Sequence, residues 1–134
     1  MKKDLLLKID NVSSGYGSTI IVNNFSFDVE RGQILAITGS NGMGKTTLMK
    51  TIMGLIKVRE GKISFKDEDI TNSSPDHRSK SGIGYVPQGR EIFSALTVEQ
   101  NIMLPIYTRK KLSFDVNDKL EESYSLFPIL KEKR

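Results

Sequence analysis

Eight consecutive residues, GSNGMGKT from Gly39 to Thr46, place glycines, a lysine and a hydroxyl at the spacing typical of a phosphate-binding loop. Gly39, Gly42 and Gly44 would let backbone N–H groups turn inward toward an anion. Lys45 could then reach the β- and γ-phosphates of a nucleotide, and the Thr46 hydroxyl could offer its oxygen to Mg²⁺. The alternative is an ordinary glycine-rich turn before a helix that begins with lysine.

The flanking residues predict the strand and the helix that such a loop needs. Residues 34–37, ILAI, form an unbroken apolar run, which favours a strand buried on both faces. From Lys45 onward, Leu48, Ile52 and Leu55 recur at helical spacing. The positive N-terminal end of that helix would face the bound phosphates.

Further strands are predicted on both sides of this unit. Residues 5–9 place Leu5, Leu7 and Ile9 on one face of a predicted strand. Residues 25–29 place Phe25, Phe27 and Val29 on one inward face, as expected of an antiparallel strand with one wet face. Strands are also predicted in two later stretches, residues 62–65 and residues 82–87. Between these two stretches, Pro75 indicates a loop over residues 73–77, which would make His77 a loop residue.

Helical character begins near residue 97. Thr97 and Gln100 have the spacing of a capping box, and Pro105 lies near the end of the helix they predict. A later apolar stripe at helical period consists of Val116, Leu120, Tyr124 and Phe127. The predicted division is therefore residues 1–96, rich in strands, and residues 97–134, helical.

The composition describes an ordinary soluble domain. Its 134 residues are 37% hydrophobic and 27% charged, contain no cysteine and carry a net charge of +4. The absence of cysteine excludes disulfides and thiolate metal sites. No apolar run reaches the length of a membrane span, so we expect no direct membrane insertion. The basic residues are dispersed, which argues against a nucleic-acid partner.

Two single residues gain interest from their positions. Tyr16, between two glycines upstream of the loop, could stack on a nucleotide base, although an ordinary half-buried loop tyrosine is the alternative. Gln88 follows the predicted strand over 82–87. Its amide oxygen could ligate Mg²⁺ and orient a water, whereas its alternative is a polar turn residue.

The order of these features resembles the ATP-binding subunit of an ABC transporter. The segments YVPQGREIF (85–93) and LTVEQNI (96–102) resemble the subgroup that serves importers of branched-chain amino acids or urea. The resemblance implies an α/β fold: a P-loop NTPase core with an N-terminal antiparallel β-subdomain and the start of a helical subdomain. It also implies ATP and Mg²⁺ as cofactors.

The family pattern assigns roles to matching positions. Tyr16 matches the aromatic residue that stacks on adenine, and Val22 lies near a lesser adenine contact. Gln88 matches the glutamine that joins the metal site to the membrane subunits. Lys45 and Gln88 are the implied catalytic residues, and Thr46 and Gln88 the implied metal ligands. The implied nucleotide contacts are Tyr16, Val22, Gly39, Ser40, Asn41, Gly42, Met43, Gly44, Lys45, Thr46 and Thr47.

The implied partners are integral-membrane permease subunits and a second ATP-binding subunit, at the cytoplasmic face of the membrane. Met43 stands where many family members have a small residue, and His77 lies too early to be the family's switch histidine. The sequence contains neither a Leu-Ser-Gly-Gly-Gln signature nor an apolar run that ends in Asp-Glu. We therefore expect the first part of such a subunit, unable by itself to hydrolyse ATP.

Three alternatives stay open. An ABC ATPase of another pathway, such as urea import or the export of lipid or polysaccharide, would share the phosphate loop. A P-loop kinase would need an arginine-rich lid, whereas the arginines here are scattered. A non-catalytic nucleotide-binding fragment would need only the residues present.

Overall fold

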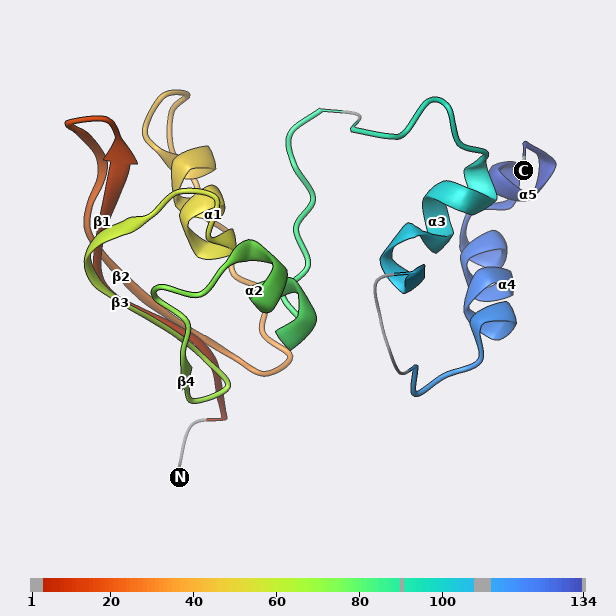
Figure 1. The fold of residues 1–134 in the computed structure, drawn as a ribbon, viewed down its shortest axis with the longest axis horizontal. Helices are drawn as coiled ribbons and strands as arrows, with labels where there is room; N and C mark the ends of the chain where they lie inside the picture. Colours follow the sequence, from red (N-terminus) through yellow and green to blue (C-terminus); the bar gives the residue numbers. More distant parts are fainter. Residues whose placement is uncertain (1–3, 90, 108–111, 134) are drawn as a thin grey trace. The chain divides into compact units, whose positions relative to one another are not determined.

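The computed structural model describes residues 4–89, 91–107 and 112–133. The chain divides into two compact units, Met1–Val86 and Pro87–Arg134 (Figure 1). The first contains the sheet and the phosphate loop, and the second contains three helices. The predicted boundary at residue 97 stays a prediction.

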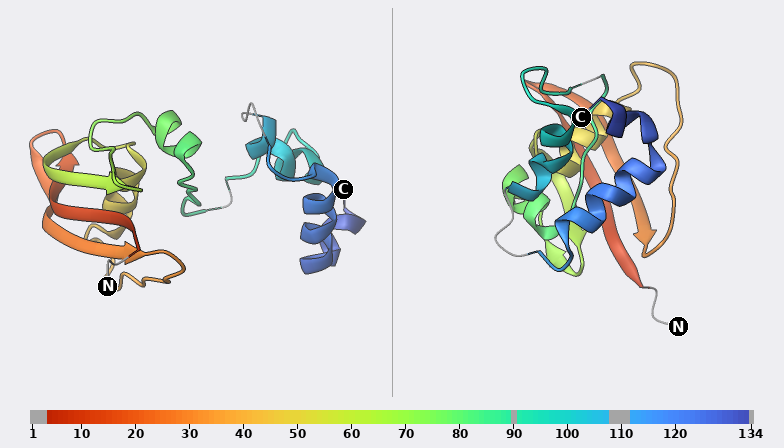
Figure 2. Two further views of the ribbon diagram at one scale, coloured as in Figure 1. Left: turned by 90° about the horizontal axis from the view of Figure 1, so that it is seen from below. Right: turned by 90° about the vertical axis from the view of Figure 1, so that its right-hand side faces the viewer.

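The first unit is built on a four-stranded antiparallel sheet with the order β2-β1-β3-β4 (Figure 2). The predicted strands at 5–9, 25–29 and 62–65 are confirmed as parts of β1, β2 and β3. The strands are β1 (Leu5–Tyr16), β2 (Thr19–Glu30), β3 (Val58–Phe65) and β4 (Glu68–Asp69).

Residues with left-handed backbone conformation lie at a turn and at irregularities of this sheet. Lys66 and Asp67, with φ of 51° and 63°, form the two-residue turn between β3 and β4, where positive φ at both positions matches the twist of the strands. Asn11 and Asn24 also have positive φ, and the pairing of β1 with β2 shifts register around them. Such irregularities bend long strands.

Helix α1 (Lys45–Met53) packs on this sheet, which confirms the predicted helix. Leu48 and Ile52 are buried in the same cluster as Ile9 and Ile63 of the sheet. Leu55, predicted on the same stripe, lies past the end of the helix and is exposed. The helix ends because Gly54 adopts a left-handed φ of 82°.

The predicted inward face of β2 is confirmed at Phe25 and Phe27, which pair with the buried residues Val12 and Ile9 of β1. Phe27 packs against the core, but Phe25 remains 39% exposed. The two rings meet edge to face with centroids 5.7 Å apart. Phe25 keeps this exposed surface because it lines the wall of a cavity.

The predicted loop at 73–77 is wrong, because helix α2 (Pro75–Ser81) begins there. The Ser74 hydroxyl accepts a hydrogen bond from the His77 N–H at 3.2 Å, and Pro75 occupies the first helical position, where its missing N–H is not needed. His77 is therefore helical, and its Nε2 lies 3.1 Å from Glu68 Oε1.

Two predicted strands are not formed. Residues 34–37 and 83–87 adopt no regular structure, and Ile34 and Val86 expose 97% and 92% of their surface. A strand buried on both faces needs a neighbour for its backbone hydrogen bonds. Within the described residues, β1 to β4 pair only with one another.

The second unit contains α3 (Val98–Tyr107), α4 (Val116–Leu126) and α5 (Pro128–Glu132). The capping box is confirmed, with Thr97 Oγ1 and Gln100 Oε1 accepting from each other's backbone N–H at 3.2 and 2.9 Å. Tyr124 is buried and donates its hydroxyl hydrogen to Glu99 of α3. Phe127, predicted on the same stripe, separates α4 from α5 and is 60% exposed.

No helix within the described ranges is long and apolar enough to cross a membrane.

Candidate nucleotide site

The phosphate loop has the backbone conformation that its glycines predict. Gly42 and Gly44 have φ of 85° and 91°, which side chains with a Cβ rarely adopt. A Cβ on Gly44 would also lie 3.1 Å from the Ile21 Cγ2 atom and 3.3 Å from the Ile21 carbonyl oxygen of β2. Glycine is therefore required at position 44 by both conformation and space.

Helix α1 starts directly after this glycine, at Lys45. Gly44 is its N-cap residue, and no side chain caps the helix. The first turn of this described helix also carries no acidic residue. Because the first N–H groups of a helix lack intrahelical partners and carry partial positive charge, this end suits an anion.

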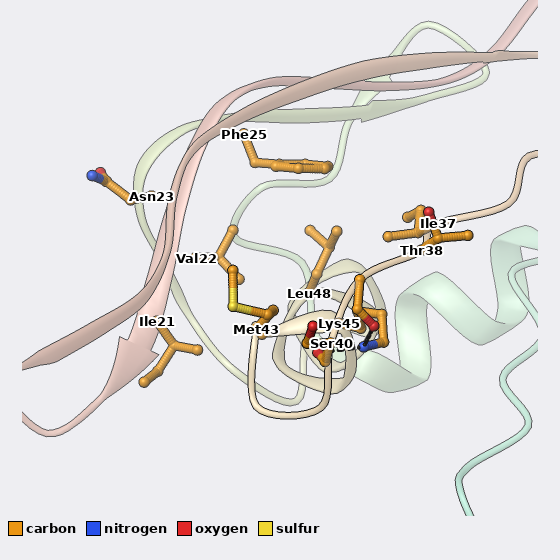
Figure 3. A pocket seen from close by; sticks show the side chains of 12 residues that line it. Ile21, Val22, Asn23, Phe25, Ile37, Thr38, Ser40, Met43, Lys45 and Leu48 are labelled. Carbon is orange, nitrogen blue, oxygen red and sulfur yellow. Dashed lines mark hydrogen bonds between the residues drawn. The ribbon is translucent and has the colours of Figure 1, made fainter.

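Lys45 closes the loop on itself. Its Nζ atom donates hydrogen bonds to the carbonyl oxygens of Gly39 and Ser40 at 2.5 and 2.8 Å, so the side chain spans the mouth of the loop (Figure 3). Carbonyl groups are weaker partners for an ammonium than phosphate oxygens. An incoming phosphate can therefore draw the ammonium away from these carbonyls without leaving it unpaired.

A cavity of about 590 Å³ lies between this loop and β2. In Figure 3, Val22, Phe25 and Leu48 surround the same hollow as Ser40 and Lys45. Its remaining lining residues come from β2 and from the loop; they are Ile21, Asn23, Ile37, Thr38, Gly39, Met43 and Gly44. The cavity thus combines apolar walls with one polar, cationic side.

The structure brings only part of the predicted site to this cavity. Val22, Gly39, Ser40, Met43, Gly44 and Lys45 line it. Three further residues of the predicted site are exposed and do not line the cavity: Asn41, Gly42 and Thr46. Thr47 is buried, so its predicted contact with nucleotide would have to come from its backbone N–H. The Thr47 carbonyl accepts a hydrogen bond from the Thr51 hydroxyl at 2.7 Å.

Tyr16 and Gln88 are not among the residues that line this cavity. Tyr16 ends β1, pairs with Thr19 across the hairpin and exposes 52% of its surface. About half of its surface is thus covered, so an ordinary half-buried tyrosine remains an alternative and the predicted stacking on a base stays a prediction. Arg59 of β3 donates a hydrogen bond to the neighbouring Gly17 carbonyl. Gln88 is exposed in a bend of the second unit, and its predicted role at the metal site stays a prediction.

The residues present fit a nucleotide better than they fit an isolated metal. The loop offers positive-φ glycines, a helix N-terminus and one lysine, which together suit phosphate oxygens. Within the described ranges, no group of three or more His, Cys, Asp or Glu side chains could hold a metal ion. The Thr46 hydroxyl could supply one ligand to a Mg²⁺ ion that nucleotide phosphates also coordinate.

Sequence reasoning missed the polar groups that hold α1 in place. The Ser14 and Thr51 hydroxyls are buried and 2.7 Å apart, which joins β1 to α1. Arg78 is fully buried and donates to α1 carbonyls. Nothing in the sequence separates Arg78 from exposed basic neighbours such as Lys80.

The fold and the loop are typical of a nucleotide-binding domain, and comparison with known proteins identifies its family. The model of the ABC transporter family matches residues 22–133, so this chain belongs to the ABC transporter family.

Three curated relatives are similar over most of this chain. A probable branched-chain amino acid transport ATP-binding protein LivF of Archaeoglobus fulgidus is 35% identical over 94% of this chain and 52% of its own length. The high-affinity branched-chain amino acid transport ATP-binding protein BraG of Pseudomonas aeruginosa is 33% identical over 96% and 54%. The lipopolysaccharide export system ATP-binding protein LptB of Haemophilus influenzae is 37% identical over 81% and 45%.

A solved structure of an ATP-binding subunit of an ABC transporter superposes with a TM-score of 0.72 and 28% identity, over 95% of this chain and 50% of that chain. This confirms the predicted fold class. The chain spans about half the length of the curated relatives it matches.

Proposed function

We propose that this chain is the ATP-gripping part of an ABC transporter ATP-binding subunit that drives import of a small polar solute, with branched-chain amino acids as the solute class. The observation that carries the proposal is the phosphate loop, where glycines in left-handed conformation lead into α1 and Lys45 spans the loop mouth. The similarity to LivF and BraG supports the solute class.

Each loop residue has a distinct role in this proposal. The N–H groups of residues 39–47 surround the phosphates, and Lys45 moves from the Gly39 and Ser40 carbonyls onto phosphate oxygens. The Thr46 hydroxyl would ligate Mg²⁺, which would neutralise phosphate charge when bound. Gln88 would contribute an amide oxygen to the metal and orient water, because its amide is too weakly basic to take a proton.

The adenine base is held by an aromatic ring and an aliphatic side chain. Tyr16 has an exposed ring that can stack on the base, and Val22 lines the cavity next to the loop. Base stacking on an aromatic residue does not require a hydrogen-bond pattern, so this contact adds affinity and little selectivity among bases.

Nucleotide binding by the 134-residue chain tests the proposal. Lys45→Ala removes the side chain aimed at the phosphates, and a charged hydrogen bond contributes about 1.5–3 kcal/mol, so ATP affinity should fall roughly 10- to 150-fold. Lys50→Ala is the matched control, because Lys50 lies in the last turn of the same helix. Equal ATP affinity of the folded Lys45→Ala and Lys50→Ala chains would refute the phosphate site.

The whole subunit would act with two permease subunits and a second ATP-binding subunit at the cytoplasmic face of the membrane. Ile92 and Phe93, 71% and 61% exposed, lie shortly after Gln88 and would contact a permease. We expect the whole segment 90–94 to face a permease, and position 90 lies outside the described residues. Site-specific crosslinkers at 91–94 should capture a permease in cells, and crosslinks confined to the ATP-binding subunit would contradict this surface.

ATP hydrolysis needs groups beyond those of residues 1–134. A carboxylate that holds the metal and one that polarises the attacking water are absent from the sequence pattern, and a positioned general base alone contributes roughly 10²- to 10⁴-fold. We therefore expect these residues to bind ATP without steady turnover. Phosphate release should appear only in a polypeptide that also contains the two carboxylates. If the 134-residue chain releases phosphate steadily and Lys45→Ala abolishes this turnover, the chain has a complete hydrolytic site and the expectation is wrong.

Export of a lipid or polysaccharide is the second candidate, favoured by the similarity to LptB. The phosphate loop serves both functions, so it does not separate them. The solute that stimulates ATP turnover by the reconstituted transporter distinguishes the two. A branched-chain amino acid delivered by its binding protein should stimulate turnover under the first proposal, and lipopolysaccharide should do so under the second.

A further inference from the structure

Arg78 is buried where an arginine is rarely found. It lies in α2, among exposed polar residues, yet only 1% of its surface is exposed. Its guanidinium donates hydrogen bonds to four backbone carbonyl oxygens, those of Thr51, Ile52, Thr71 and Ser73, at 2.9, 2.7, 2.9 and 3.1 Å. The side chain thus joins three segments of the first unit through their backbones.

Two of these acceptors belong to the last turn of α1. The Thr51 carbonyl also accepts a hydrogen bond from the Gly54 N–H at 3.0 Å, and this end of the helix carries partial negative charge. A cation there adds a charged donor to both carbonyls and complements the helix dipole. The other two acceptors, Thr71 and Ser73, lie in the segment that connects β4 to α2.

Gly54 leaves space for this contact. A Cβ at Gly54 would lie 2.9 Å from Arg78 Nε, so the glycine that ends α1 also admits the guanidinium. Burial away from water lowers the pKa of Arg78 from its usual value. A methionine would fill similar space without this desolvation, so what the guanidinium adds is a rigid set of donors in a fixed geometry.

The N-terminal end of α1 is part of the candidate phosphate site. Lys45 is the first residue of α1, and Thr51 lies six residues later, about 9 Å along the axis at 1.5 Å per residue. The Thr51 hydroxyl also binds Ser14 of β1 and the carbonyl of Thr47. A rigid helix held at its last turn keeps its first turn, and therefore the loop, in one position.

We propose that Arg78 is a positioning residue for the phosphate loop: it clamps the C-terminal end of α1 and so fixes the direction in which Lys45 and the loop N–H groups face the nucleotide. The inference rests on the proposed nucleotide site. It assigns to α2 a role in binding that does not require contact between α2 and the nucleotide.

Three variants of the 134-residue chain test the clamp. Arg78→Met removes all four hydrogen bonds and retains an unbranched side chain, whereas Arg78→Lys retains a cation that can reach some of the carbonyls. Ile9→Val is the control, because Ile9 is a buried core residue of β1 that loses one methylene and none of the α1 hydrogen bonds. ADP affinity is measured by calorimetry at urea concentrations that give each variant the same folded fraction.

We expect Arg78→Met to weaken ADP binding on the order of tenfold, since small misplacements of binding groups have large effects. Arg78→Lys should recover part of the loss, and Ile9→Val should bind like the unmodified chain. Backbone amides of residues 42–48 should exchange hydrogen faster in Arg78→Met than in Ile9→Val. If Arg78→Met does not fold, Arg78→Lys is compared with Ile9→Val in the same two measurements.

Equal ADP affinity and equal amide exchange in the arginine variant and in Ile9→Val would overturn the inference. Failure of the proposed function would look different, because the unmodified chain itself would then not bind ADP. In that case the exchange comparison, which needs no nucleotide, still decides whether Arg78 holds the loop.

Discussion

Gly44 offers a sharp test of the loop geometry, because it combines two separable constraints. Its φ of 91° is unfavourable for any residue with a Cβ, and its site is crowded by Ile21 of β2. Gly42 has nearly the same φ, 85°, but a Cβ there would meet no atom within 4 Å. Comparison of Gly44→Ala with Gly42→Ala therefore isolates the contact with β2.

The magnitudes follow from these two terms. A left-handed conformation costs an alanine about 1–2 kcal/mol, and both variants carry this cost. At Gly44 the new methyl group lies 3.1 Å from Ile21 Cγ2 and 3.3 Å from the Ile21 carbonyl oxygen, which should add about 1 kcal/mol or more of overpacking. Gly44→Ala should thus destabilise the first unit by about 2–3 kcal/mol and Gly42→Ala by about 1–2 kcal/mol.

Urea unfolding measures this difference. With a slope of about 1–3 kcal/mol per molar urea, the midpoints of the two variants should differ by roughly 0.3–1 M. Ile21→Ala removes the Cγ2 atom, so the double variant Gly44→Ala/Ile21→Ala should be more stable than the sum of the two single changes predicts. Equal midpoints for Gly44→Ala and Gly42→Ala, together with additive double-variant effects, would refute the crowding argument.

Three further predictions concern single side chains. Tyr16→Ala should weaken ATP binding by about 1–3 kcal/mol while Tyr16→Phe is tolerated, and a titration that finds equal affinity for both would remove Tyr16 from the site. Thr97→Ala should destabilise α3 by about 1 kcal/mol, seen as faster amide exchange confined to that helix. The side-chain and backbone hydrogen bonds from Thr71 lower the pKa of Asp69, so this carboxylate stabilises the fold above its unfolded-state pKa and loses that contribution as pH falls through the folded value. Thr71→Val should raise the pKa of Asp69 toward its ordinary value in an NMR titration, and an unchanged pKa would contradict this assignment.

Sequence patterns predicted the parts of the fold that depend on near neighbours. The glycine spacing around Lys45 gave the loop and the helix that follows, because left-handed φ and the start of a helix are set within a few residues. Thr97 and Gln100 likewise form the predicted reciprocal cap. The loop prediction at 73–77 failed because proline, which breaks a helix interior, is favoured at the first helical position, so Ser74-Pro75 is a helix-start signal.

Long-range pairing was predicted less well. The apolar run at 34–37 has the composition of a buried strand, but composition does not say which segment will supply its hydrogen-bond partners. In the described structure Ile34 is 97% exposed and no strand pairs with it. The exposed surface of Phe25 was not predicted for a similar reason, because alternation assigns this side chain to the inward face but does not show that a cavity lies there.

Arg78 shows why the support of a binding site is harder to predict than the site itself. The residues that touch phosphate belong to one contiguous motif, because a loop and a helix start can surround an anion with adjacent N–H groups. The guanidinium that holds this helix lies in another helix, 27 residues beyond its Thr51 acceptor, and recognises backbone carbonyls that every residue type provides. A side chain that binds backbone places no demand on the sequence of its partners beyond the space that Gly54 leaves. Such a contact becomes visible only when both helices are placed, and its loss should affect nucleotide affinity through the direction of α1.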